Sequence, residues 1–175
     1  MKKVLYLVVP ILFFLIISYL LPTQKPTTET ISVPMPVDAI TRVVTSQKDW
    51  AKWFPGTKVN DSVYTYYESP ITIHKVLMNG FKATMINKGV EVDLDFSFIA
   101  DHNAKASFTL NTVMKITYNP LLRFKQFLSL NSVENDCKRL LYQMQDYFSD
   151  VEKVYGFPIQ MQKVPNSSYV SAKQT

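Results

Sequence analysis

The sequence predicts an α+β fold in which a strongly curved antiparallel sheet grips one long C-terminal helix, preceded by one transmembrane helix. Three patterns lead to this prediction. Segments 90–98 and 104–116 alternate apolar and polar residues with a period of two, as half-buried strands do. Segment 133–154 carries an apolar stripe at helical spacing. An uncharged apolar run extends from Val4 to Leu21.

The apolar run at residues 4–21 is predicted to be a signal anchor that stays in the membrane. At a rise of 1.5 Å per residue it spans about 27 Å, close to the hydrocarbon thickness of a bilayer. The alternative is a cleaved signal peptide, which has a shorter apolar region followed by small residues; here Pro22 follows instead. Because Lys2 and Lys3 precede the run, we expect a single-pass protein with a cytoplasmic N-terminus and the domain on the outer, periplasmic side.

The whole chain divides into four predicted parts. Residues 1–22 are the anchor, 23–30 a polar linker, 31–155 one domain, and 156–175 a tail of uncertain structure. The net charge of the chain is +5, but residues 31–175 carry only +3, dispersed without a basic stripe, so no nucleic-acid partner is expected. Cys137, the single cysteine, lies on the apolar side of the predicted long helix and is expected to be a buried structural thiol.

Local signals place the boundaries of the domain's elements. Asn79-Gly80 predicts a hairpin turn, and Asp101 begins a second turn. Asn131 with Glu134 three residues later predicts a capping box at the start of the long helix. The predicted strands are 31–33, 62–68, 71–78, 81–86, 90–98 and 104–116, and the predicted helices are 36–45, 48–54, a shorter one at 120–130, and the long helix 131–154.

One face of strand 90–98 is acidic. Glu91, Asp93 and Asp95 alternate with the apolar positions and could bind a cation, but Lys105 and Lys115 are expected on the same face of the next strand. A solvated outer face with cross-strand pairs is therefore the preferred interpretation. The sequence contains no phosphate loop, dinucleotide fingerprint or nucleophile motif, so neither a cofactor nor a metal is expected.

This order of elements resembles the helix-grip fold of the START-like, or SRPBCC, superfamily, which includes polyketide cyclase/dehydrase-like proteins and lipid carriers. The resemblance covers about residues 28–154 and is carried by ISVPMPV at 31–37 and WAKWFP at 50–55. A weaker resemblance concerns VYGFPIQMQKVP at 154–165, which is similar to the start of a gyrase-inhibitor-like effector-binding domain. The chain stops at Thr175, so we expect either a shortened relative of a longer protein or a disordered end.

The START-like resemblance implies a hydrophobic ligand cavity between the sheet and the long helix, with Trp50 and Trp53 near its mouth. The alternative is that the same side chains simply fill a core. The residues expected to line the cavity are Phe96, Phe98, Phe108, Leu110, Met114, Leu141, Met144 and Phe148.

Three functions follow from this resemblance. The preferred one is a membrane-tethered, non-catalytic carrier or sensor that binds a hydrophobic small molecule or lipid. The second is a cyclase/dehydrase-type enzyme using the same cavity, with His74 as a weak catalytic candidate. The third is a sensor or interaction module with a protein partner or a missing C-terminal effector domain. Neither His74 nor His102 lies in a metal-binding spacing.

Overall fold

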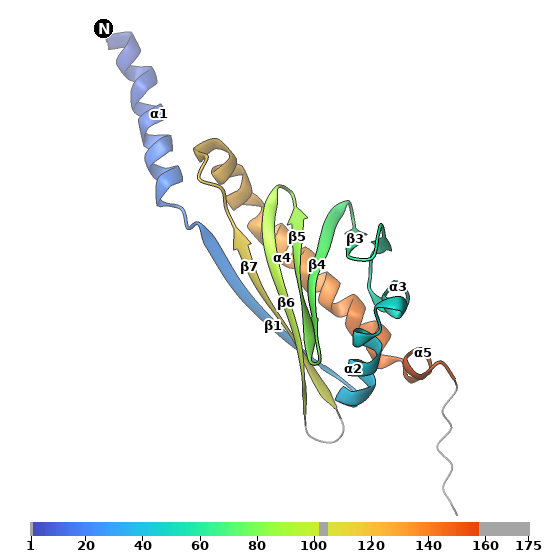
Figure 1. Cartoon of the computed structure of the whole chain (residues 1–175). Coiled ribbons are helices and arrows are strands. Elements are labelled where there is room, and N and C mark those ends of the chain that lie inside the picture. Colours follow the sequence, from blue (N-terminus) through green and yellow to red (C-terminus); the bar gives the residue numbers. More distant parts are fainter. Residues whose placement is uncertain (1, 102–104, 158–175) are drawn as a thin grey trace, which may run out of the picture.

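The computed structural model describes residues 2–101 and 105–157, and Figure 1 shows helix α4 crossing one face of a single antiparallel sheet. The helical elements are α1 (Lys2–Leu20), α2 (Val37–Thr45), the 3-10 turn η1 (Gln47–Asp49), α3 (Trp50–Trp53), α4 (Pro120–Ser149) and α5 (Val151–Tyr155). The strands are β1 (Gln24–Val33), β2 (Thr57–Lys58), β3 (Val63–Tyr66), β4 (Ser69–Leu77), β5 (Gly80–Asn87), β6 (Val90–Ala100) and β7 (Ala106–Lys115).

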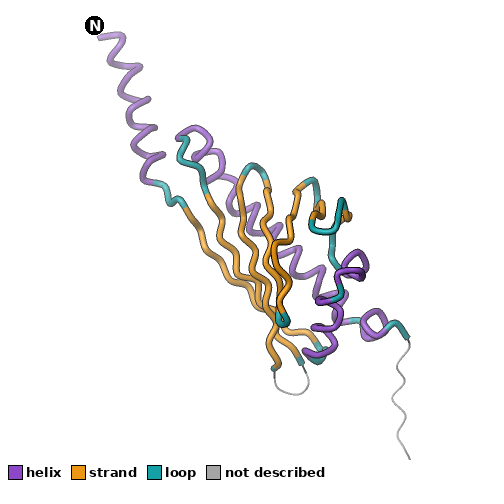
Figure 2. The backbone as a smooth tube through the Cα atoms, in the orientation of Figure 1, coloured by secondary structure: helices purple, strands orange, loops and turns teal. Residues whose placement is uncertain are grey.

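The sheet has seven strands in the order β1-β7-β6-β5-β4-β3-β2, and every neighbouring pair is antiparallel. The strands from β2 to β7 are adjacent in sequence order, whereas β1 joins the far edge by pairing with β7. The tube in Figure 2 shows the sheet narrowing toward the end where α2 begins. The fold therefore brings α2 and α3 against the end of the sheet that lies away from α1 (Figure 1).

The predicted alternation of buried apolar and exposed polar residues along the central strands is confirmed. In β6 the apolar positions from Val90 to Phe98 are buried and the intervening polar positions are not. On the outer face, Lys115 pairs with Glu91 at 2.9 Å and with Asp93 at 2.8 Å. One face of the sheet is thus covered and the other is wet, as expected for an antiparallel sheet with helices on one side.

The predicted linker at residues 23–30 is wrong. Residues 24–30 form the first part of β1, which pairs with β7 from Gln24 opposite Lys115 to Val33 opposite Ala106. On the outer face, hydroxyl side chains match across the two strands, as Thr30 and Thr109 do at 3.1 Å. The polar composition suggested a linker, but β-branched threonines suit a strand whose outer face is solvated.

The predicted start of the long helix at Asn131 is also wrong, because α4 begins at Pro120 and absorbs the shorter helix expected at 120–130. The side chain of Asn119 accepts hydrogen bonds from the backbone N–H groups of Leu121 and Leu122, and proline occupies the first turn. This is a standard N-terminal cap. The proline that follows has no backbone N–H, but an N–H in the first turn would have no partner inside the helix in any case. Asn131 lies in the helix interior and accepts from Lys25.

The hairpin around Asn79-Gly80 is confirmed, although its two turn residues are Met78 and Asn79, since Leu77 pairs with Gly80. The long apolar stripe is confirmed as well: Val133, Leu140, Met144 and Phe148 are buried against the sheet. The helix predicted at 48–54 is confirmed as η1 followed by the single turn α3.

Helix α1 lies beyond the sheet and contacts the domain at the start of α4 (Figure 1). Among the residues that the structure describes, no helix is both long and apolar enough to cross a membrane. The turn expected at His102 and nearly all of the predicted tail at 156–175 lie outside the described residues.

Candidate functional site

A cluster of aromatic rings fills the space where α3 meets the sheet and α4. The ring of Trp53 lies 4.9 Å from that of Trp50 and 5.4 Å from that of Phe148 of α4. The ring of Trp50 lies 4.9 Å from that of Phe81 of β5, and Phe54 lies 4.9 Å from Tyr64 of β3. Pairs at such distances in edge-to-face or tilted geometry stabilise the packing beyond simple burial, so α3 is fixed to the core by its aromatic residues.

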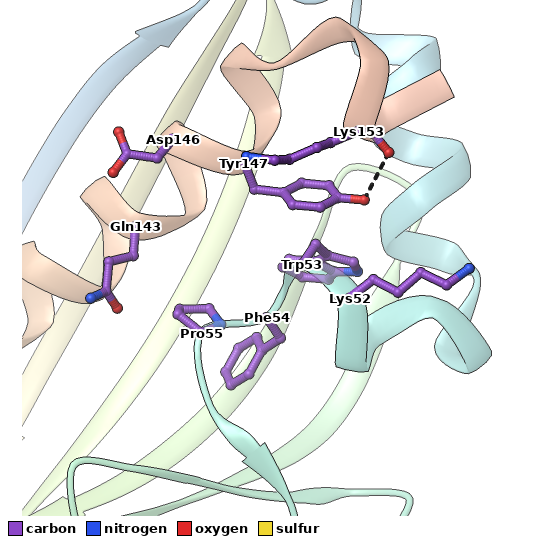
Figure 3. Close-up of a pocket in the computed structure, with 8 residues that line it drawn as sticks. All are labelled: Lys52, Trp53, Phe54, Pro55, Gln143, Asp146, Tyr147 and Lys153. Atoms are coloured by element: carbon purple, nitrogen blue, oxygen red, sulfur yellow. Dashed lines mark hydrogen bonds between the residues drawn. The ribbon is translucent and has the colours of Figure 1, made fainter. Parts of the chain in front are cut away.

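Beside this cluster lies an open groove between α3 and α4. One hollow of about 510 Å³ is lined by Trp53, Phe54 and Pro55 on the α3 side and by Gln143, Asp146 and Tyr147 of α4, with Lys52 and Lys153 at its rim. Figure 3 shows the two sets of side chains extending from their separate elements. We call this hollow, together with its neighbour described next, the α3–α4 groove.

A second hollow of about 450 Å³ continues the groove toward the sheet edge. It shares Pro55 and Gln143 with the first hollow, and it is further lined by Gly56, Thr57, Thr65, Tyr66 and Tyr67. The segment between α3 and β3 forms its outer wall. That wall is held to the sheet by a short pairing: Thr57 and Lys58 of β2 pair with β3, and the backbone N–H groups of Val59 and Asn60 donate to the carbonyl of Val63.

Two buried polar atoms along this groove have no hydrogen-bond partner within the described structure: the Nε1 of Trp53 and the hydroxyl of Tyr66. Burial raises the pKa of Tyr66 to about 12, so its hydroxyl stays protonated and can donate. An unsatisfied buried donor costs about 1–3 kcal/mol. Both atoms therefore offer a gain in free energy to a ligand that brings a hydrogen-bond acceptor.

The charged groups at the rim are already paired. Lys52 contacts Asp49 at 2.6 Å and Lys153 contacts Asp150 at 3.1 Å. The hydrogen bond with Lys52 lowers the pKa of Asp49, and that with Asp49 raises the pKa of Lys52. The hydroxyl of Tyr147 donates to the backbone carbonyl of Lys153 at 3.1 Å (Figure 3). The groove thus combines an aromatic floor with two neutralised lysines and the carboxylate of Asp146.

The residues predicted to line a cavity pack together in one hydrophobic core and do not line a hollow of the described structure. All eight of them are buried in that core, and none lines the hollows described here. Phe108 illustrates the packing, since its ring lies 5.3 Å from that of Phe148 and 5.4 Å from that of Phe98. Trp50 and Trp53 are both buried, and Trp53 also lines the groove.

The structure places the catalytic candidate His74 on the outer face of the sheet. Its Nε2 lies 2.8 Å from the Oγ1 of Thr84, and it lines an outer hollow with Lys82 and Asp95. A β-bulge between Ile73 and Lys75 sets its position. His74 therefore cannot act as an acid or base in the space under α4. Within the described ranges, no three His, Cys, Asp or Glu side chains converge to hold a metal.

Sequence reasoning missed most of the groove's lining. Tyr66 was part of a tyrosine-rich predicted strand, but the strand's weak alternation did not identify the inward ring. Gln143 lies on α4 beside the apolar stripe, where a polar residue is easily read as solvent-facing, and Tyr147 belongs to the predicted stripe but was not expected to line a groove. The one available signal was the WAKWFP segment, because a proline after paired tryptophans ends α3 and opens the space next to it.

No protein-family model matches the sequence, and no curated protein matches it. Among solved structures, a conserved protein from Geobacillus kaustophilus superposes with a TM-score of 0.50, covering 71% of this chain and 95% of that one at 8% identity. Together with the strand order and the covering helix, this match decides the architecture.

The chain has the helix-grip fold. Other structures with similarity to this helix-grip chain include the di-domain ARO/CYC StfQ from the steffimycin biosynthetic pathway, with a TM-score of 0.49 and 9% identity over 72% of this chain and 51% of that one. A START superfamily protein from Mycobacterium smegmatis has a TM-score of 0.39 and 11% identity, covering 68% of this chain and 98% of that one. The helix-grip fold expected from the sequence is confirmed by the strand order and the covering helix.

Proposed function

We propose that this protein is a membrane-tethered, non-catalytic domain that binds a hydrophobic small molecule or lipid through the α3–α4 groove. The observation that carries the proposal is the pairing of an aromatic floor with the two unpartnered donors, Trp53 Nε1 and Tyr66 hydroxyl. Small-molecule sites typically combine aromatic and apolar side chains with a few placed polar groups, and the groove offers both kinds of group. The ligand class is a molecule with an apolar body and a hydrogen-bond-accepting head.

Ligand entry is proposed to extend the groove into the space under α4. The part of the outer wall beyond α3 is held less tightly, because β2 contributes only two residues to the sheet, whereas α3 itself is fixed by its aromatic contacts. Phe148 and Trp53 stand at the boundary between groove and core with their rings in contact. Displacing the wall would expose the buried apolar positions of β6, β7 and α4, which are those expected to line the cavity.

Ligand binding can be tested with the intrinsic fluorescence of the full chain in lipid nanodiscs, since the chain has two tryptophans, of which Trp53 lines the groove and Trp50 lies 4.9 Å from Trp53, ring to ring. We expect titration with anilinonaphthalene sulfonate to give saturable energy transfer from tryptophan, and palmitate to displace the probe. Protein-free nanodiscs give the background. Tyr66→Phe should weaken binding without altering the fold. Transfer no greater than background would refute the proposal.

The membrane tether is proposed to be α1, with the domain on the outer side. Apart from Phe14 and Ser18, the side chains described from residue 12 to residue 20 are exposed and nearly all are apolar. A helix that is apolar all round is stable only when buried in protein or lipid. The test is extraction of membranes with carbonate, followed by protease digestion of intact spheroplasts. We expect retention in the membrane and external digestion of the domain; a carbonate-soluble or protected domain contradicts the tether or its orientation.

The enzyme alternative now lacks a candidate, because His74 faces outward. The interaction-module alternative predicts a different result in the nanodisc titration, namely no saturable binding of apolar probes. No specific contact of the described residues favours either alternative over ligand binding.

A further inference from the structure

A patch of exposed apolar side chains covers the first turns of α4. It consists of Tyr118, Leu121, Leu122 and Leu128, whose exposed fractions are 82%, 70%, 52% and 67%. Leu121, Lys125 and Leu128 follow one another at spacings of four and three, so they share one face of the helix. We call these four apolar residues the α4 patch. Large apolar side chains gathered on one exposed surface mark a contact with another phase or molecule.

The α4 patch lies directly beside α1. The Oγ of Ser18 donates to the carbonyl of Pro120 at 2.8 Å, and the rings of Phe14 and Phe124 lie 5.4 Å apart. Leu121 precedes Phe124 by three residues and Leu128 follows it by four, so the patch flanks the α1 contact on the surface of α4. The first turns of α4 therefore run alongside the last two turns of α1.

Arg123 fixes this arrangement electrostatically. Its guanidinium donates to the backbone carbonyl of Leu21, just beyond the C-terminal end of α1, and the side chain is buried. A cation at this end of a helix is favoured by the helix dipole and by the carbonyl groups that have no partner inside the helix. The contact holds α1 and α4 at a defined angle, so the patch keeps its place relative to α1.

The charges around the patch favour a negatively charged surface. Residues 116–133 contain no aspartate or glutamate, while Lys125 lies exposed among the leucines. A surface of leucine and tyrosine with an adjacent lysine is the usual composition of a segment that lies in the interface of a bilayer with anionic lipids. An aromatic side chain such as Tyr118 also favours this depth.

We propose that the α4 patch rests in the headgroup region of the membrane that α1 enters, so that the protein is attached at two points. This inference rests on the proposed tether through α1. If the chain enters the bilayer at the end of the apolar run, the contacts of Ser18 with Pro120 and of Leu21 with Arg123 set the start of α4 at interfacial depth. Continuity with α1 selects lipid over a protein partner as the occupant.

Two-point attachment would fix how the domain stands on the membrane. From Leu121 to Gln143, α4 rises by about 33 Å at 1.5 Å per residue. The α3–α4 groove would then lie at the end of the domain remote from the bilayer, as the positions of α1 and α3 in Figure 1 suggest. A ligand would reach the groove from the aqueous side instead of directly from the lipid.

The experiment uses the full chain in phosphatidylcholine vesicles containing phosphatidylglycerol. An environment-sensitive thiol probe is attached at Lys125→Cys in the patch or, as a matched control, at Lys48→Cys in η1 at the opposite end. Cys137 is buried and its pKa is raised to about 12 by burial, so the native thiol stays unlabelled. We expect the emission of the Lys125→Cys probe to shift to the blue and to be quenched by headgroup-labelled lipid, with neither effect at Lys48→Cys.

A patch variant and a control variant complete the test. Leu121→Ser with Leu122→Ser and Leu128→Ser should abolish the shift while the protein still floats with the vesicles. Val59→Ser with Met78→Ser and Ile99→Ser removes equally exposed apolar groups elsewhere and should leave the shift intact.

The remaining outcomes separate the two proposals. If the protein floats with the vesicles but the Lys125→Cys probe stays exposed to solvent, the membrane contact of the α4 patch is refuted and the tether through α1 is not. Failure to float overturns the tether itself. A blue shift that disappears when the protein is diluted into excess vesicles identifies a second protein copy as the occupant and overturns the lipid contact.

Discussion

Trp50 and Trp53 contact each other edge to face at 4.9 Å, yet within the described chain only the first has a partner for its indole N–H. The Nε1 of Trp50 donates to the carbonyl of Val44 at 2.7 Å and so fastens α3 to the end of α2. The Nε1 of Trp53 is buried without an acceptor. Two identical side chains one helical turn apart thus have different roles, one structural and one open to a ligand.

This difference predicts unequal losses of stability on truncation. Trp50→Phe and Trp53→Phe remove the same atoms, but only Trp50→Phe leaves the buried carbonyl of Val44 without its donor. We expect the free energy of unfolding to fall by about 1–3 kcal/mol more for Trp50→Phe. Urea denaturation followed by circular dichroism in one detergent measures both. Equal losses would show that the Val44 hydrogen bond contributes nothing.

The start of α4 supplies a second prediction. Asn119 accepts from the N–H groups of Leu121 at 3.1 Å and Leu122 at 3.4 Å, so Asn119→Ala should cost about 1 kcal/mol of stability. Asn131, which the sequence suggested as the cap, contacts only Lys25 through its side chain. Asn131→Ala should change stability by less than about 0.5 kcal/mol. Thermal unfolding of the two variants ranks them, and the reverse order would contradict the observed cap.

The contrast between the two asparagines shows where sequence reasoning succeeded. The alternation of β6 and β7 and the stripe of α4 are long repeating patterns, so each reports burial many times over, and both are confirmed. The cap and the linker were single local signals. Asn131 with Glu134 satisfies a capping pattern by chance, and a threonine-rich stretch can be a linker or an outer strand until its partner β7 is known.

The site was harder to predict than the fold. Burial of the eight apolar residues followed from periodicity, but periodicity cannot distinguish a packed core from an open cavity. The groove depends on long-range contacts, since Pro55 and Gln143 meet only because α4 crosses the sheet beside α3. An unpartnered donor such as Trp53 Nε1 is likewise defined by its three-dimensional neighbours and leaves no trace in the sequence.

The contact between β1 and α4 predicts that the stability of the fold depends on pH. Lys25 of β1 contacts Glu134 of α4 at 2.7 Å, and this hydrogen bond holds the pKa of Glu134 below its usual value. A carboxyl with a lowered pKa stabilises the fold above its unfolded-state pKa, and this contribution is lost as the pH falls through the folded value. Glu134→Gln should therefore cost about 0.5–1 kcal/mol at neutral pH, a value reduced by partial exposure.

The stability difference between wild type and Glu134→Gln should shrink as the pH falls from the usual pKa of a glutamate and vanish below the lowered pKa of Glu134, where the wild-type carboxyl is also neutral. Glu152, whose carboxylate makes no ion pair within the described chain, gives the control Glu152→Gln. Urea denaturation at a series of pH values provides the curves. A difference for Glu134→Gln that does not depend on pH would mean that the Lys25 contact is not responsible.

Gly80 and Gly89 test two separate reasons for glycine in this sheet. A Cβ on Gly80 would lie 1.9 Å from the carbonyl oxygen of Phe96, so β5 would have to move away from β6. Gly89 has a φ of 78° in the β5–β6 turn and open space around its Cα. Gly80→Ala should cost at least about 3 kcal/mol, as large steric changes in a core do, whereas Gly89→Ala should cost about 1–2 kcal/mol of left-handed strain. Urea denaturation of both variants measures the two losses of stability. A smaller loss for Gly80→Ala than for Gly89→Ala would show that the close approach of β6 is not the reason for glycine at position 80.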